Sequence, residues 1–198
     1  MRNALRPAAL VAIIGLVLLS PLLLLLALLV RADLGKPVLF RQIRSGRGGR
    51  AFVMLKFRSM RELTDGSGTP LPDEQRVTAF GRFLRRSRLD ELPELINIAR
   101  GDMDFVGPRP LLPSTIDALR EDGAVRGLVR PGLTGLAQVS GNTLLTVEEK
   151  LRFDLWYVRN RSLALDARIL ARTVAVVFWG EKRIDWRGDE LRPPHWGN

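Results

Sequence analysis

The stretch AALVAIIGLVLLSPLLLLLALLV, from Ala8 to Val30, decides the fold because it carries no charge and has Ser20-Pro21 near its middle. One straight helix of this length would reach about 35 Å, which is enough to cross a bilayer. Pro21 removes a backbone hydrogen bond and clashes with the preceding turn, so we expect a kink or break there. The Ser20 hydroxyl can then satisfy a backbone group that the break leaves free.

The charges on either side of this stretch favour the same side of a membrane for both ends. Arg2 and Arg6 precede it, and basic residues far outnumber acidic ones between Arg31 and Arg61. Basic flanks prefer the cytoplasmic side. A full span would place one flank outside, whereas a helix–break–helix hairpin keeps both inside, and each arm alone is too short to cross. From the residues alone both alternatives stay open; a cleaved signal peptide is a third, although its apolar core of about 7–15 residues would be shorter.

The composition excludes several kinds of active site. The chain of 198 residues has a net charge of +10, no cysteine and one histidine, His195. There is therefore no disulfide framework and no thiolate metal site, and a lone histidine in a terminal segment argues against a histidine-based triad or zinc site. The basic excess favours anionic partners, namely nucleic acid, anionic lipid or phosphorylated substrates. Catalysis would have to use carboxylates, arginine, lysine or a metal held by oxygen.

The apolar pattern after Val30 predicts one membrane-associated α+β domain with more helix than strand. Two strands around a Gly/Arg turn are expected at Val38–Ile43 and Ala51–Phe57, and residues 64–75 form a loop by composition. The other expected elements are helices around Phe80–Leu84, from Asp90 to Gly101, over Ser114–Glu121, from Thr146 to about Arg159 and over Leu165–Trp179, and a short strand over Leu136–Val139.

The adjacent carboxylates Asp90 and Glu91 are the sharpest chemical feature. They are predicted to begin a helix, whose N-terminus carries partial positive charge, and Arg85, Arg86 and Arg88 come just before them. Both effects favour the ionised form, which suits a nucleophile or a metal ligand. Taken alone, the pair is explained as simply by a helix N-cap, Asp90, followed by a first-turn acid.

Cationic residues elsewhere in the chain extend this candidate site. Lys56 and Arg58 fall on one face of the second predicted strand, and Arg109 is held between two prolines. Together with the arginine cluster of residues 82–88 they form a set that phosphoryl transfer needs, namely cations to spread charge beside an oxygen nucleophile. Mg²⁺ uses few protein carboxylates together with substrate phosphates, so one glutamate can suffice. A solvated strand face is the alternative for Lys56 and Arg58.

Three motifs, in order after the apolar stretch, resemble the bacterial sugar transferase family, the monotopic polyprenyl-phosphate phosphoglycosyl transferases. They are KFRSM, TAFGRFLRRSRLDELPELINIARGDMDFVGPRP and PGLTGLAQVSG. The resemblance covers the chain from about residue 8 to residue 180. It implies transfer of a sugar-1-phosphate from a nucleotide diphosphate sugar, usually a UDP-sugar, to undecaprenyl phosphate, with release of UMP.

The resemblance also implies roles for individual residues. Asp90 would be the nucleophile, forming a phosphosugar–aspartyl intermediate, and Glu91 would hold Mg²⁺. The residues expected to bind or support substrate phosphates are Lys56, Arg58, Arg85 and Arg109. Arg88, Asp104 and Asn142 depart from the common pattern, which leaves nucleotide contacts and sugar choice open.

The family's Ser-Pro break makes a re-entrant helix, and Ser20-Pro21 lies at the corresponding place. The resemblance therefore favours the hairpin over the full span, with residues 1–35 as the re-entrant membrane helix, 36–185 as the catalytic domain and 186–198 as a tail. The expected domain is mostly helical, with a small β-hairpin and amphipathic interfacial helices, and lies on the cytoplasmic face of the bacterial inner membrane. Nucleic acid is not expected as a partner, since no binding motif accompanies the charge; a membrane-tethered nucleic-acid-binding or scaffold protein is the alternative.

Overall fold

The computed structural model describes residues 6–183, which form two compact units. The first unit contains residues 6–43 and 53–101, and the second contains residues 44–52 and 102–183. The predicted tail, residues 186–198, lies outside the described residues. The domain boundaries expected from the sequence stay a prediction.

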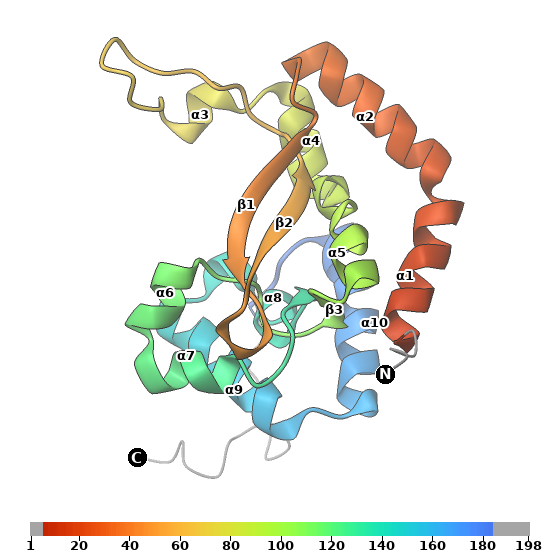
Figure 1. The fold of residues 1–198 in the computed structure, drawn as a ribbon, viewed down its shortest axis with the longest axis vertical. Coiled ribbons are helices and arrows are strands. Elements are labelled where there is room, and N and C mark those ends of the chain that lie inside the picture. Colours follow the sequence, from red (N-terminus) through yellow and green to blue (C-terminus); the bar gives the residue numbers. More distant parts are fainter. Residues whose placement is uncertain (1–5, 184–198) are drawn as a thin grey trace. The chain divides into compact units, whose positions relative to one another are not determined.

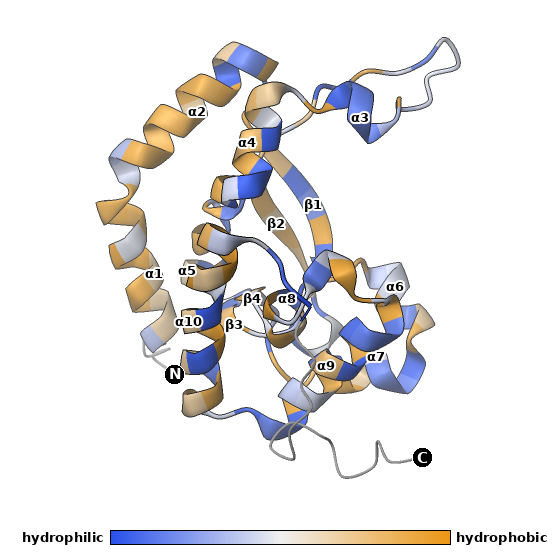
Figure 2. Cartoon of the chain, turned by 180° about the vertical axis from the view of Figure 1, so that it is seen from behind, coloured by the Kyte–Doolittle hydropathy of each residue, from blue (hydrophilic) through white to orange (hydrophobic). Residues whose placement is uncertain are grey.

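The apolar stretch forms two helices with a bend between them (Figure 1). Helix α1 covers Pro7–Leu18 and α2 covers Ser20–Leu34, and their axes differ by 66°. The Ser20 hydroxyl donates to the carbonyl oxygen of Val17 at 2.7 Å, so the predicted repair of the break by this side chain is confirmed. No single helix among the described residues is long and apolar enough to cross a membrane. By length and composition, the bent pair fits either a broken span or a re-entrant loop. Figure 2 shows both helices apolar over most of their length.

The first unit continues into the predicted β-hairpin and three helices. Strands β1, Leu39–Ser45, and β2, Ala51–Phe57, form a two-stranded sheet joined through the short 3-10 helix η1, Arg47–Gly49. By compactness, the turn of this hairpin belongs to the second unit. The following elements are α3, Asp73–Arg76; α4, Ala79–Ser87; the 3-10 turn η2, Leu89–Glu91; and α5, Glu94–Arg100.

Both arms of the N-terminal helix pair are packed within this unit. Helix α1 lies alongside α5, with the small residues Ala9 and Ala12 buried and Gly15 beside Leu95. The apolar cluster under α2 is made of Leu26, Val30, Phe57 and Leu84, which come from α2, β2 and α4. The helix pair is therefore held against the elements that flank Asp90 and Glu91.

The second unit has a helical core around two short parallel strands. Strand β3, Asp104–Val106, pairs with β4, Gly132–Thr134, so that Asp104 lies opposite Gly132. The remaining elements are α6, Pro113–Ala118; α7, Arg120–Arg126; α8, Leu136–Val139; the 3-10 turn η3, Asn142–Leu144; α9, Val147–Asn160; and α10, Leu163–Trp179. Its apolar core consists of Val106, Leu136, Val139, Trp156, Tyr157, Leu165 and Ile169.

Most predicted elements are present, and the exceptions have local causes. The predicted α9 begins with the expected capping box, in which Thr146 and Glu149 exchange both hydrogen bonds. The strand expected at Leu136–Val139 is wrong, because this segment is a single helical turn with all four side chains buried. A run of four apolar or amide residues has too little periodicity to separate strand from buried helix. Helix α10 leaves Val174 and Phe178 exposed, but contact of this face with a membrane stays a prediction.

Candidate functional site

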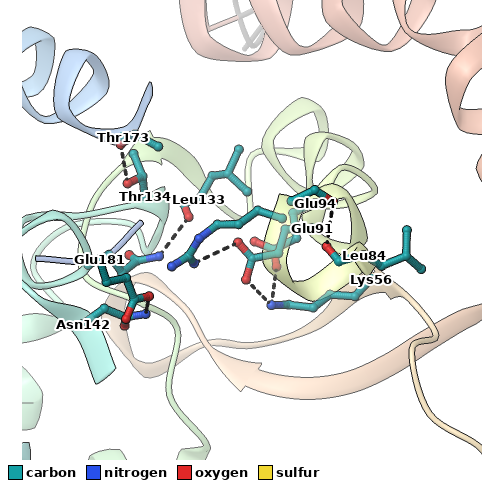
Figure 3. A network of polar contacts seen from close by, with 12 residues as sticks. Lys56, Leu84, Glu91, Glu94, Leu133, Thr134, Asn142, Thr173 and Glu181 are labelled. Atoms are coloured by element: carbon teal, nitrogen blue, oxygen red, sulfur yellow. Dashed lines mark hydrogen bonds and ion pairs between the residues drawn. The ribbon is translucent and has the colours of Figure 1, made fainter. Parts of the chain in front are cut away.

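Lys56 lies between two carboxylates in the first unit. Its Nζ is 2.6 Å from Glu91 Oε1 and 3.2 Å from Glu94 Oε1, as Figure 3 shows. Glu91 and Glu94 are buried, and the Lys56 side chain is only 13% exposed. Ion pairs in such surroundings are screened weakly by solvent and salt. Lys56 and Glu91 were both expected at the site; Glu94 was not, and its spacing from Glu91 in a helix-forming run was the available signal.

Asn97 holds the strand that carries Lys56. It is fully buried in α5, accepts from the backbone N–H of Leu55 at 3.1 Å and donates to the carbonyl of Val53 at 2.8 Å. Its amide therefore replaces a neighbouring strand along part of β2. Asn97 was not predicted, because the sequence pattern of an amide among apolar helix residues is the same whether the amide is exposed or buried.

Asp90 differs from the expectation in both conformation and electrostatics. It lies in η2, and α5 begins only at Glu94 after Pro93, so Asp90 is not the N-cap of that helix. Burial, and next the negative charge of Glu91, raise the pKa of Asp90, while Lys56 and Arg85 act in the opposite direction. The predicted net stabilisation of the ionised form is therefore wrong in direction. Within the part of the chain that the structure describes, the Asp90 carboxylate makes no ion pair with a cation inside 4 Å.

Arg85 also belongs to the first unit and lies on α4. Its Nε donates to the Ser59 hydroxyl at 3.0 Å, and its Nη1 lies 3.7 Å from Asp73. Helix α4 can approach the KFRSM segment only because Gly81 lacks a side chain; a Cβ there would lie 2.0 Å from the Ser59 carbonyl oxygen. An open hollow of about 420 Å³ beside Arg85 is lined by Asp73, Glu74, Val77, Arg82, Arg85 and Arg86.

Arg88, one of the departures from the family pattern, joins α4 to the carboxylate turn. Its φ of 55° is left-handed, a conformation that favours glycine or asparagine, and it caps the C-terminus of α4. Its Nη1 lies 3.7 Å from Glu91 Oε2. A basic side chain at this position thus contributes a second cation to Glu91.

Arg58 is directed at backbone oxygens. Its guanidinium donates to the carbonyls of Leu34 and Lys36, the latter at 3.1 Å, and the residue is only 6% exposed. The strict alternation expected in β2 also fails, since the neighbours Met54 and Leu55 are both buried. Phosphate binding by Arg58 stays a prediction.

Arg109 belongs to the second unit. Its carbonyl accepts from Arg126 at 2.9 Å, and Arg126 forms a buried ion pair with Asp154 whose shorter N–O distance is 2.6 Å. A cavity of about 20 Å³ beside these arginines has room for one water. The predicted grouping of Arg109 with Lys56, Arg58 and Arg85 stays a prediction.

Asn142, another departure from the family pattern, also lies in the second unit. Its φ of 41° is left-handed, and its side-chain amide donates to Glu181 (Figure 3). The backbone N–H of Thr143 donates to the same carboxylate at 3.1 Å. The turn after the QVSG segment is thus tied to Glu181, two residues beyond the end of α10.

The carboxylates of the first unit suit Mg²⁺ in the way that phosphate-dependent enzymes hold it. No group of three or more histidine, cysteine, aspartate or glutamate side chains that could hold a metal ion occurs in residues 6–183. Asp90 and Glu91 nevertheless supply adjacent, partly desolvated oxygens, and their mutual repulsion is one cause of the raised pKa of Asp90. A cation bound by one or two carboxylates and completed by substrate phosphates fits this donor set.

Comparison with known proteins places the chain in a family. The family model described as bacterial sugar transferase matches residues 7–180. The chain is 43% identical to "Uncharacterized sugar transferase EpsL" of Bacillus subtilis (strain 168), over 82% of this chain and 80% of that protein. It is 44% and 42% identical to proteins named UDP-glucose:undecaprenyl-phosphate glucose-1-phosphate transferase from Xanthomonas campestris pv. campestris and Caulobacter vibrioides, over 86% and 79% of this chain. It spans 37% and 62% of those two proteins, which is less than two thirds of their length. The chain belongs to the bacterial sugar transferase family.

Proposed function

We propose that this protein transfers a sugar-1-phosphate from a nucleotide diphosphate sugar, namely a UDP-sugar, to undecaprenyl phosphate. The observation that carries the proposal is the Asp90–Glu91 pair, partly buried next to Lys56, in a chain of this family. The products are UMP and an undecaprenyl-diphosphate sugar. The reaction would be the first membrane step of a surface glycan pathway.

In the first step, a carboxylate oxygen of Asp90 attacks the phosphorus that bears the sugar. The bond from this phosphorus to the bridging oxygen of the diphosphate breaks, UMP leaves, and an aspartyl–phosphosugar is formed. Lys56 and Arg85, which already oppose the raised pKa of Asp90, would offset the negative charge that gathers there. The raised pKa also makes Asp90 a stronger nucleophile once ionised than an ordinary aspartate.

In the second step, an oxygen of the lipid phosphate attacks the same phosphorus. The bond to Asp90 breaks, the carboxylate is regenerated, and the lipid diphosphate sugar leaves. No net proton is taken up or released between the two steps. Two displacements at one phosphorus allow the soluble donor and the membrane-bound acceptor to use one site in turn.

The proposed location is the cytoplasmic face of the bacterial inner membrane. The basic flanks of α1 and α2 favour a re-entrant hairpin with both ends inside, and nucleotide sugars are cytosolic. The expected partners are therefore the nucleotide sugar, undecaprenyl phosphate and membrane lipids. Labelling of an Asn3→Cys variant from the cytosolic side supports the hairpin, whereas labelling only from outside would restore a full span.

Mg²⁺ is the proposed cofactor, with Glu91 as its protein ligand. When bound, it would supply positive charge to the diphosphate. Glu91→Gln should reduce the dependence of UMP release on Mg²⁺ concentration. An unchanged metal response in that variant would assign Glu91 a structural role, as the partner of Lys56 and Arg88.

The decisive experiment measures UMP release from a panel of UDP-sugars with undecaprenyl phosphate and Mg²⁺. Asp90→Asn should abolish both turnover and the covalent adduct seen by intact-protein mass spectrometry. A matched control is Asp65→Asn, an exposed acid of the same unit whose carboxylate contacts Ser67 and Thr69. Wild-type turnover in Asp90→Asn would remove Asp90 as the nucleophile. Salt-sensitive nucleic-acid binding without UMP release would favour the nucleic-acid-binding alternative.

A further inference from the structure

Three consecutive residues of the KFRSM segment connect the carboxylate pair to the N-terminal helices. Lys56 contacts Glu91 and Glu94, Phe57 joins the apolar cluster under α2, and Arg58 contacts the end of α2. We propose that Arg58 is a positioning residue that fixes the end of α2 relative to Lys56, and that it does not bind the donor phosphates. This inference rests on the proposed function for its kinetic consequences only.

The contacts of Arg58 are those of a helix cap. Leu34 is the last residue of α2, and Arg58 Nη2 donates to its carbonyl while Nη1 donates to that of Lys36 at 3.1 Å. The last carbonyls of a helix have no partner within it and carry partial negative charge, so a cation there is favourable. The backbone N–H of Arg58 also donates to Val38 at 2.9 Å. Both terminal nitrogens of the guanidinium are thus engaged by backbone.

A second polar contact holds the same end of α2 from another element. The Thr78 hydroxyl donates to Asp33 at 2.5 Å and accepts from the backbone N–H of Gly81 at 2.9 Å. Thr78 is the N-cap of α4, the helix that carries Arg85. The end of α2 is therefore tied to β2 through Arg58 and to α4 through Asp33. Leu26 and Val30 of α2 also pack in one apolar cluster with Phe57 and Leu84.

The two proposed steps depend on these ties in different ways. Attack by Asp90 on a soluble nucleotide sugar uses Asp90, Glu91 and Lys56, which lie in η2 and β2 and not in the helix pair. Attack by a membrane-bound phosphate also needs the carboxylates at the correct height above the membrane, which the helix pair sets. A displacement of about 1 Å can cost up to about 100-fold in rate. Loss of Arg58 should therefore slow the lipid-dependent step more than the donor step.

The kinetic test compares Arg58→Gln and Arg58→Lys with the wild-type full chain in nanodiscs. UMP formation without lipid acceptor, in a single turnover, should stay within about twofold of wild type, with an unchanged KM for the UDP-sugar. Discharge of the adduct by undecaprenyl phosphate should slow by about tenfold or more. Glu62→Gln is the control, because it removes only a weak 3.8 Å pair between Arg58 and a largely exposed acid. A donor step that slows as much as the lipid step, with a raised KM for the UDP-sugar, overturns the proposal in favour of a phosphate ligand.

Asp33→Ala provides a second variant that leaves the arginine in place. It removes the contact with Thr78 at the same end of α2, so adduct discharge should again slow while adduct formation is retained. This variant keeps the test informative if the substitutions of Arg58 prevent folding. Normal discharge in Asp33→Ala, with Arg58 variants failing in the donor step, contradicts the proposal.

A distance measurement tests the same idea without using activity. The chain has no cysteine, so spin labels attach only to introduced cysteines. We choose Leu28→Cys in α2 and Arg86→Cys in α4, because both positions are exposed. The distance distribution between the labels should broaden in Arg58→Gln and in Asp33→Ala, and stay unchanged in Glu62→Gln. An unchanged distribution in Arg58→Gln overturns the positioning role. Absence of UMP release from the wild-type protein would refute the proposed function and leave this measurement valid.

Discussion

The two units each contain a buried ion cluster, but the clusters are balanced differently. In the second unit, Arg126 and Asp154 form a one-to-one pair, and Arg126 uses a further N–H on the Arg109 carbonyl. In the first unit, Lys56 contacts both Glu91 and Glu94, Arg88 also pairs with Glu91, and Asp90 lies nearby with a raised pKa.

This difference separates a structural ion pair from a reactive one. Burial raises the pKa of Asp154 as well, but Arg126 opposes that change through both its charge and its hydrogen bond. For Asp90 the second cause, the charge of Glu91, adds to burial. A carboxylate whose ionised form is opposed by both burial and a neighbouring negative charge is suited to receive a cation or an electrophile, which is typical of functional sites.

The largest expected effect comes from breaking the balanced pair. Asp154→Asn should lower the free energy of unfolding by about 3–5 kcal/mol, because it leaves the Arg126 guanidinium buried without its counter-charge. Chemical denaturation measures this change, with Glu121→Gln as an exposed control in α7 that should shift stability by less than about 0.5 kcal/mol. Equal stabilities of Asp154→Asn and the control would show that the pair contributes little.

Substitution of Asn97, a neutral residue that holds β2 next to the cluster of the first unit, should have an intermediate effect on stability. Asn97→Ala leaves the Leu55 N–H and the Val53 carbonyl without their partner, at a cost of about 1–3 kcal/mol for such buried groups. Asn97→Asp is the matched variant, since it can still accept from Leu55 but cannot donate to Val53. Denaturation midpoints should fall in both. No loss in either variant would indicate that β2 is held by other contacts.

Removing the negative charge of Asp90 should change stability in the opposite direction, as a gain. Asp90→Asn replaces a carboxylate whose ionised form is disfavoured by burial and by Glu91, so thermal stability should rise while turnover is lost. For a protein of this size, each kcal/mol moves Tm by about 2–4 °C. Differential scanning fluorimetry in detergent measures the change. A lower Tm would contradict the claim that the ionised form of Asp90 is disfavoured in the fold.

The smallest expected effect is the pH dependence of the stability gained in Asp90→Asn. A carboxyl group whose pKa is raised in the folded state binds its proton more tightly in that state than in the unfolded state. Its contribution to folding stability is therefore fully present below the unfolded-state pKa and is lost as pH rises through the folded-state pKa. The stability advantage of Asp90→Asn over wild type should therefore shrink as pH falls from neutral. A constant difference down to pH 4 would mean that Asp90 has an ordinary pKa.

The sequence predicted the elements whose signals are local. The break beside Ser20, the capping box of Thr146 and Glu149, and the two strands around the Gly/Arg turn all depend on neighbouring residues, and all are present. The 3-10 turn at Asp90 was missed, because a carboxylate before a proline favours an N-cap just as well. The short helix at Leu136 was missed because burial, and not periodicity, sets its conformation.

The sequence by itself determined the family, the pair of carboxylates and the bent apolar helices, because motifs, composition and proline act through covalent order and local geometry. Only the tertiary structure decided the charge state that Asp90 favours, the partners of Lys56 and the direction of Arg58. Each of these depends on desolvation and on residues far apart in the chain, such as Lys56 with Glu91 or Arg58 with Leu34. Coulomb and desolvation energies follow spatial distance and burial, which the order of residues alone does not specify.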